Sequence, residues 1–172
     1  MTELAQQLIE KEKRERTGYL DLGNCGLTEM PDLSELEWLE TLILSNEWWN
    51  QKQQKQIKSS NDGLRNLFKD TPKATAFPSK LRSLTIGGGF SSIWSIRNVE
   101  FLQNLTQLQS LELRSNHISD AAFLRNLTQL QALDLSYNNI SEAAYLQKIT
   151  QQRKQTQLTK QQSTIRLANF EV

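Results

Sequence analysis

The chain has 172 residues, with 20 lysines and arginines against 19 aspartates and glutamates, one histidine and one cysteine. This length suits a single domain, and a formal charge of +1 excludes a uniformly basic nucleic-acid binder. A lone cysteine excludes an internal disulfide and a thiolate zinc cluster. No apolar run approaches the ~20 residues that span a bilayer. Because the N-terminus also carries no secretion signal, we expect a cytoplasmic protein with no membrane partner.

Residues 1–17 predict an N-terminal capping helix. Thr2 can act as its N-cap, since a threonine hydroxyl accepts a hydrogen bond from a free N–H of the first turn. Leu4, Ala5, Leu8 and Ile9 share one apolar face, whereas charged residues and glutamines fill the others. Such a helix would cover one end of the structure that follows it.

Residues 18–146 carry about five copies of a leucine motif. In the two clearest copies, 102–118 (LQNLTQLQSLELRSNHI) and 124–140 (LRNLTQLQALDLSYNNI), matching residues lie 22 apart. The L-x-L segment alternates with period two, as in a short strand with one buried face. The leucines before it are three apart, the period of a 3₁₀ turn. One coil cannot bury its own apolar face, so we expect the coils to stack into a solenoid with a parallel sheet.

Weaker copies of the motif precede these two, at Leu20 and Leu22, at Leu42 and Leu44, and at Leu84 and Ile86. About 20 extra residues separate the second copy from the third, which predicts an inserted loop at about 47–80. We expect Trp49 to fill the core position equivalent to Leu27. Trp48 either packs against the loop or contacts a partner.

The inserted loop also has seven lysines and arginines against three acids. This composition would allow nucleic-acid binding. We do not favour nucleic acid as a partner, because basic loop residues are usually just solvated.

At the C-terminus, residues 147–172 predict a polar segment and a possible sixth strand. Residues 147–164 are rich in glutamine, lysine and threonine. Beyond them, Ile165 and Leu167 match the spacing of Leu133 and Leu135 at an offset of 32. That offset corresponds to one repeat with ten inserted residues.

Cys25, Asn116 and Asn138 each follow an L-x-L segment by three residues, where the chain turns inward. A small polar or thiol group there can hydrogen-bond the backbone of neighbouring coils, so we expect these three to be structural turn residues. Cys25 is therefore not expected to be a nucleophile. His117, the only histidine, lies in the variable position of such a turn and is expected to be solvated. We expect no catalytic residues, metal site or cofactor.

The repeated motif resembles the leucine-rich repeat (LRR) superfamily in its 22-residue class. This resemblance implies an α/β fold: a right-handed solenoid with a curved parallel sheet on its concave face and short 3₁₀ or helical turns on its convex face. The stretch YLDLGNCGLTEMP at residues 19–31 is also similar to the N-terminal LRR region of bacterial Roco proteins, where a short helix leads into such a stretch. That second resemblance implies that the chain is either a fragment of a larger protein or a free-standing relative. GTP binding would then belong elsewhere, since this chain has no phosphate-binding P-loop motif.

The residues between the strand leucines are expected to face the concave side, where they form the working surface. The predicted central column is Asp21, Ile43, Thr85, Glu112, Asp134 and Arg166, flanked by residues that include Tyr19 and Arg114. The predicted function is a non-catalytic module that binds a protein or peptide partner through this face and the inserted loop. The alternative is the regulatory N-terminal portion of a Roco-type GTPase, with that GTPase domain as an intramolecular partner.

Overall fold

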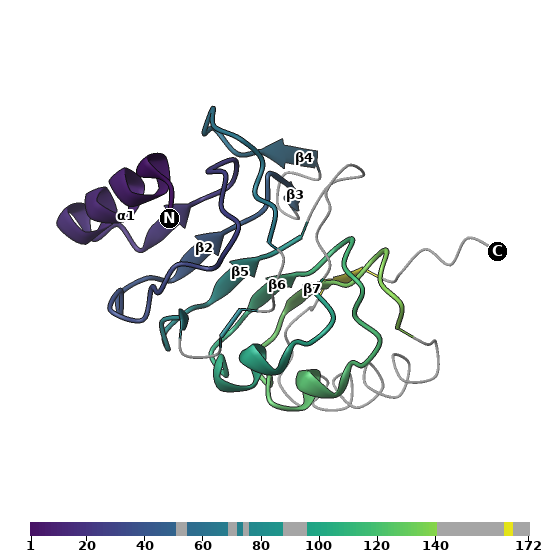
Figure 1. Cartoon of the computed structure of the whole chain (residues 1–172). Coiled ribbons are helices and arrows are strands. Elements are labelled where there is room, and N and C mark those ends of the chain that lie inside the picture. The colour runs from purple at the N-terminus through teal and green to yellow at the C-terminus, as the bar shows by residue number, and fades with distance from the viewer. Residues whose placement is uncertain (51–54, 69–71, 74–75, 88–95, 141–163, 167–172) are drawn as a thin grey trace.

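Six short parallel strands form the framework of the chain, whose computed structural model describes residues 1–50, 55–68, 72–73, 76–87, 96–140 and 164–166. They lie side by side in chain order (Figure 1). The strands are β1 (Tyr19–Asp21), β2 (Thr41–Ile43), β5 (Ser83–Thr85), β6 (Ser110–Glu112), β7 (Ala132–Asp134) and β8 (Thr164–Arg166). Every neighbouring pair is parallel, as the stacked repeats predict. The predicted solenoid fold is confirmed.

The register of the sheet aligns the first leucine of every L-x-L segment. The aligned residues are Leu20, Leu42, Leu84, Leu111, Leu133 and Ile165. The five leucines of this row are buried, with 0–3% of their surface exposed. The second apolar residue is buried as well in the first five segments, at Leu22, Leu44, Ile86, Leu113 and Leu135. Successive coils therefore share one leucine-filled interior.

On the side of the coils opposite the sheet, the chain returns through short 3₁₀ turns (Figure 1). Two of these turns are η2 (Glu100–Asn104) and η3 (Ala122–Arg125). The N–H of Leu105 donates to the carbonyl of Leu102 at 3.0 Å, and the N–H of Leu108 donates to that of Leu105 at 3.1 Å. These three-residue steps explain the leucine spacing, because they keep every third side chain directed into the core.

Helix α1 (Glu3–Glu15) lies at the β1 end of the sheet (Figure 1). Thr2 is its N-cap, as expected, and accepts a hydrogen bond from the N–H of Ala5. Ala5 and Ile9 are buried in the common core, so the helix covers the first coil. Glu12, on a face expected to be solvated, is also buried.

The insertion contains an antiparallel hairpin of β3 (Glu47–Asn50) and β4 (Lys55–Lys58). This hairpin projects beyond the ends of the first strands of the main sheet (Figure 1). Trp48 is half-buried on β3, opposite Ile57 of β4. Part of the expected loop is thus regular β-structure outside the main sheet.

The repeat interrupted by this hairpin resumes at Asn66. The Asn66 side-chain amide donates to the carbonyls of Leu22 and Leu44, at 2.7 and 2.8 Å. Asn138 makes the equivalent pair of bonds with the carbonyls of Leu113 and Leu135. The inserted segment is therefore 47–65, and the core position two residues after the asparagine belongs to Phe68, which is 3% exposed. The expectation that Trp49 fills this position is wrong, because the whole hairpin lies outside the register of the repeat.

The predicted sixth strand is present as β8, which pairs with β7. The polar segment expected before it falls at 147–164, of which all but residue 164 lies outside the described residues. In the described part of the chain, no helix is both long and apolar enough to cross a membrane.

Candidate binding surface on the sheet

The predicted central column lies in register across the sheet: Asp21, Ile43, Thr85, Glu112, Asp134 and Arg166 are successive partners. These residues are less exposed than the predicted open surface requires. Ile43, Thr85 and Asp134 are buried, with 4%, 7% and 3% of their surface exposed. Asp21 and Glu112 are half-buried, and the side chain of Arg166 lies outside the described part of the structure. Most of the column is thus covered, so it cannot act as a simple exposed stripe.

The two flanks of the column differ in accessibility. On the flank where the strands begin, the aligned residues of the first five strands are at least partly exposed: Tyr19, Thr41, Ser83, Ser110 and Ala132. Tyr19 is the most open of them, at 50%. On the flank where the strands end, Gly23, Ser45, Gly87 and Ser136 are buried and Arg114 is half-buried. The accessible part of the sheet is therefore the flank at the strand starts.

Close backbone contacts help to close the other flank. A β-carbon on Gly23 would clash with the carbonyl oxygen of Ser45 and lie 2.6 Å from the β-carbon of Ser59. A β-carbon on Gly87 would clash with the carbonyl oxygen of Arg114. Glycine permits both approaches because it has no side chain to displace the neighbouring chain.

The insertion already binds one predicted site residue, Asp21. The Asp21 carboxylate accepts hydrogen bonds from the N–H of Gly23 at 2.8 Å and from the hydroxyl of Ser59 at 3.1 Å. The Asn61 amide donates to the backbone carbonyls of Asp21 and Gly23, at 2.9 and 2.8 Å. Burial raises the pKa of Asp21, and the hydrogen bonds from Gly23, Ser59 and Ser60 oppose that rise only in part. Asp21 is thus an internal contact of the fold.

Asp134, at the equivalent position of β7, has a different environment. One carboxylate oxygen accepts from the N–H of Ser136 at 2.9 Å and from the hydroxyl of the same residue. The other oxygen, Oδ2, is buried and receives no hydrogen bond from the described residues. An unpaired buried carboxylate oxygen is costly for the folded state.

Sequence reasoning missed Tyr137, which lies beside Arg114. The Arg114 guanidinium carbon is 4.6 Å from the centre of the Tyr137 ring, and Tyr137 remains 42% exposed. Tyr137 has a left-handed backbone with φ of 57°, as do Asn24 and Ser115 at the same place in other coils. An aromatic residue where other repeats hold a small polar residue is a signal readable from the sequence.

Asn116 and Asn138 lie in the inward turns, as their spacing predicts. The side-chain oxygen Oδ1 of Asn138 accepts a hydrogen bond from the N–H of Ile118 at 3.0 Å, and Oδ1 of Asn116 accepts one from the N–H of Ile96 at 3.3 Å. Asn66 plays the same role in the second coil, accepting from the N–H of Leu27 at 2.9 Å. Its motif, Asn66-Leu-Phe, matches Asn138-Asn-Ile, so an alignment that allowed an insertion before the asparagine would have found it.

The Cys25 thiol is buried and lies 3.5 Å from the carbonyl oxygen of Gly23 in its own turn. Burial and the nearby Asp21 carboxylate raise the pKa of this thiol to about 11. The thiolate is therefore scarce at neutral pH.

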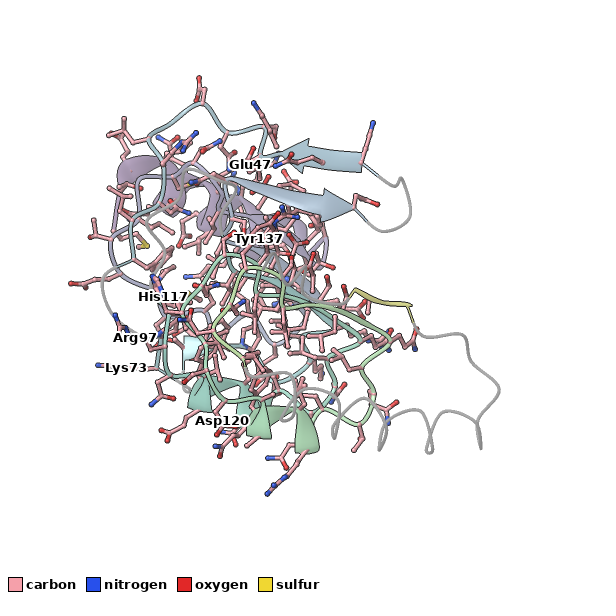
Figure 2. The ribbon with its side chains drawn as sticks, turned by 90° about the vertical axis from the view of Figure 1, so that its right-hand side faces the viewer. Glu47, Lys73, Arg97, His117, Asp120 and Tyr137 are labelled. Carbon is pink, nitrogen blue, oxygen red and sulfur yellow. The ribbon has the colours of Figure 1, made fainter. Side chains whose placement is uncertain are left out.

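His117 is exposed at the outer edge of the molecule (Figure 2). No group of three potential metal ligands occurs among the residues that the structure describes.

Comparison with protein families matches residues 106–148 to the model "Leucine Rich repeats (2 copies)". Comparison with curated proteins found no match. Among solved structures, an internalin (inlF) from Listeria monocytogenes is similar at 23% identity and a TM-score of 0.51, over 82% of this chain and 33% of the internalin. Internalin C2 of the same organism is 24% identical, with a TM-score of 0.49, over 74% of this chain and 46% of that one.

This chain therefore spans a third to a half of the length of these internalins. The likeness to the first internalin concerns the fold, which agrees with the parallel sheet and leucine core described above. Residues 106–148 match the leucine-rich-repeat model, and the chain has a parallel-sheet solenoid fold similar to that of the first internalin.

Proposed function

We propose that the chain is a non-catalytic scaffold that binds a protein or peptide partner through the outward face of its sheet and the adjoining hairpin. The observation that carries this proposal is the exposed flank of the sheet, defined by Tyr19, Thr41, Ser83, Ser110 and Ala132. These side chains come from five consecutive strands held in one register. Such a preformed surface loses little conformational entropy on binding. The LRR fold supports an interaction role in general.

A non-catalytic role is also supported by the chemistry of the candidate nucleophile. The Cys25 thiol is buried, and its pKa is raised to about 11. Nucleophilic catalysis by cysteine needs the thiolate, which a lowered pKa and an accessible position favour. Cys25 has neither property, so its contribution is to the packing of the turn.

Two variants, each with two arginine substitutions, test the proposal: one changes the sheet, and the other changes positions outside it. The variant Thr41→Arg/Ser110→Arg adds two long charged side chains to the exposed flank, on strands that are not direct neighbours. The matched control Gln103→Arg/Thr128→Arg adds the same charge at exposed positions outside the sheet. Proteins captured by the wild type are identified by mass spectrometry and measured again with each variant.

We expect the sheet variant to lose a captured protein that the control retains, while both keep the wild-type circular dichroism spectrum. Equal capture by both variants would place the binding surface elsewhere. Asp134→Arg is unsuitable for this test, because Asp134 is only 3% exposed and a buried arginine would disturb folding.

An alternative is that the chain is the regulatory N-terminal portion of a larger Roco-type GTPase from a bacterial cytoplasm. The order of α1, β1 and the Cys25 turn agrees with the short helix and following repeat that the Roco resemblance implies. A gene whose reading frame continues into a P-loop, and whose full product binds a fluorescent GTP analogue, would support this alternative. A full product without nucleotide binding would contradict it.

A further inference from the structure

The dipeptide Asp62-Gly63 is exposed and lies between two points at which the insertion is bonded to the first coil. Before it, the Asn61 side-chain amide donates to two backbone carbonyls near the end of β1, at 2.9 and 2.8 Å. After it, the carbonyl of Leu64 accepts from the N–H of Gly26 at 2.7 Å. The two exposed residues therefore form a short bridge that is anchored on both sides.

Asp62 differs from the other described aspartates in how its side chain is held. Four carboxylates each accept from the backbone N–H two residues later, at 2.8–3.0 Å: Asp21, Asp32, Asp120 and Asp134. This Asx turn holds the carboxylate away from the N–H of the residue that directly follows it. No described residue donates a hydrogen bond to the Asp62 side chain or accepts one from the Gly63 N–H. Asp62 thus lacks the bond that fixes the other four.

The residue that follows each of these aspartates also differs. Glycine follows Asp62, whereas the four others are followed by larger residues: Leu22, Leu33, Ala121 and Leu135. Glycine has no side chain that would hinder the approach of its backbone nitrogen to the preceding carboxyl group. Exposure, an unfixed carboxyl group and a following glycine therefore coincide at Asp62.

We propose that Asp62-Gly63 is a modification site, at which the aspartate isomerises spontaneously to isoaspartate. The Gly63 nitrogen attacks the side-chain carboxyl carbon of Asp62, and a new C–N bond forms. The carboxyl OH leaves as water with the proton of the Gly63 N–H, which gives a five-membered succinimide ring. Water then adds to this ring: opening at the side-chain carbonyl restores aspartate, and opening at the main-chain carbonyl leaves the chain linked through the side chain. The mass of the protein is unchanged, and water is the only co-reactant.

Isoaspartate would strain the two anchored ends of the bridge, because it lengthens the main chain by one methylene group. Asn61 and Leu64 are both bonded to the first coil, so one of these contacts must shift to accommodate the extra carbon. Gly63 itself lies close to that coil, since a β-carbon on it would clash with the carbonyl oxygen of Asn24. We expect the isomerised chain to hold the insertion less firmly and to unfold at a lower Tm. This inference is independent of the proposed function.

Peptide mapping of the folded chain tests the inference. The full chain is kept for several weeks in neutral buffer, well below its Tm, and is then cleaved with trypsin. The digest releases residues 59–65 (SSNDGLR) and residues 115–125, which contain Asp120. Isoaspartate is detected as a peptide of unchanged mass and changed chromatographic retention that protein L-isoaspartyl methyltransferase methylates. Such an isomer should accumulate in 59–65, and no isomer of unchanged mass should form in 115–125.

Two variants provide matched controls. Asp62→Glu should remove the isomer, because glutamate would have to close a less favourable six-membered ring. Ala121→Gly creates a second aspartate–glycine pair at Asp120, whose carboxylate accepts from the N–H of Ala122 at 2.8 Å. In this variant Asp120 should isomerise severalfold more slowly than Asp62 of the same chain. Circular dichroism checks that both variants keep the wild-type fold.

Thermal unfolding gives the second readout. After the same incubation, the Tm of the wild type should fall in proportion to the isomerised fraction, and the Tm of Asp62→Glu should not. Three results would overturn the inference: no isomer in 59–65 of the folded wild type, equal rates at Asp62 and Asp120 in Ala121→Gly, or equal losses of Tm in the wild type and Asp62→Glu.

Discussion

Glu12 shows how a single residue can join the capping helix to the first coil. Its carboxylate accepts from the N–H of Gly18 at 2.9 Å and from the indole N–H of Trp38 at 2.8 Å. It also accepts from the N–H and the hydroxyl of Thr17. Burial acts to raise the pKa of Glu12, but these hydrogen bonds outweigh burial and lower it. The ionised form is therefore favoured in the folded protein.

Replacing Glu12 by glutamine should destabilise the protein by about 1.5–3 kcal/mol at pH 7, the contribution of hydrogen bonds to a charged group. Urea denaturation measures this difference. Glu15→Gln is a suitable control, because Glu15 is exposed on the same helix; its effect should stay below about 0.5 kcal/mol. Equal effects of the two variants would contradict a structural role for Glu12.

The stabilisation from Glu12 should also depend on pH. Its pKa in the folded protein lies below the ordinary value of 4.5. Ionised Glu12 therefore stabilises the fold fully above about pH 4.5, and this contribution is lost as the pH falls through the lowered folded-state pKa. The difference between wild type and Glu12→Gln should shrink when urea denaturation is repeated at about pH 3. A difference that stays constant between the two pH values would contradict the assignment.

At the scale of elements, Asn66 is the residue at which the second repeat resumes after the inserted segment 47–65. Its side chain is fully buried and bonds the backbone of Leu22, Cys25, Leu27 and Leu44. Asn66→Ala should cost at least about 2–3 kcal/mol, because it leaves several buried backbone groups without partners. Chemical denaturation measures the loss, with the exposed Asn104→Ala as the control expected to be near neutral. A near-neutral Asn66→Ala would mean that the repeat does not resume there.

Removal of residues 47–65 should leave a folded solenoid. The excision joins Leu44-Ser-Asn46 to Asn66-Leu-Phe68, which restores the spacing of Leu135-Ser-Tyr-Asn-Asn-Ile140. The shortened chain should keep a cooperative unfolding transition at a lower Tm, since Asp21 and Gly23 lose their contacts with Ser59 and Asn61. Circular dichroism and thermal unfolding test this. Loss of cooperative unfolding would show that the insertion is an integral part of the core.

Across the whole molecule, the strands, their register and the capping helix could be predicted from the sequence, because each follows from apolar spacing over a few residues. The burial of the flank where the strands end could not be predicted in this way. Its burial at Gly23 depends on Ser59, which is 36 residues away in the chain and directly follows the hairpin. The same holds for Phe68, whose core position depends on where the repeat resumes after the hairpin.

Because the coils share one interior, substitutions in the leucine row should destabilise the fold more than substitutions of exposed residues. Leu133 is 2% exposed, whereas Gln131, two residues earlier, is exposed. Leu133→Ala should cost about 2–5 kcal/mol because it leaves a cavity between coils, and Gln131→Ala should cost less than about 0.5 kcal/mol. Chemical denaturation measures both values. Similar losses at the two positions would mean that the leucine row does not form a common core.

The most direct test of the central claim, that the outward face of the sheet is the binding surface, is hydrogen exchange of the chain with and without its captured partner. Protection on binding is expected in β5, β6 and β7, at residues 83–85, 110–112 and 132–134. Exchange in η2 and η3, on the opposite side of the coils, should be unchanged. Protection confined to η2 and η3 would contradict the claim.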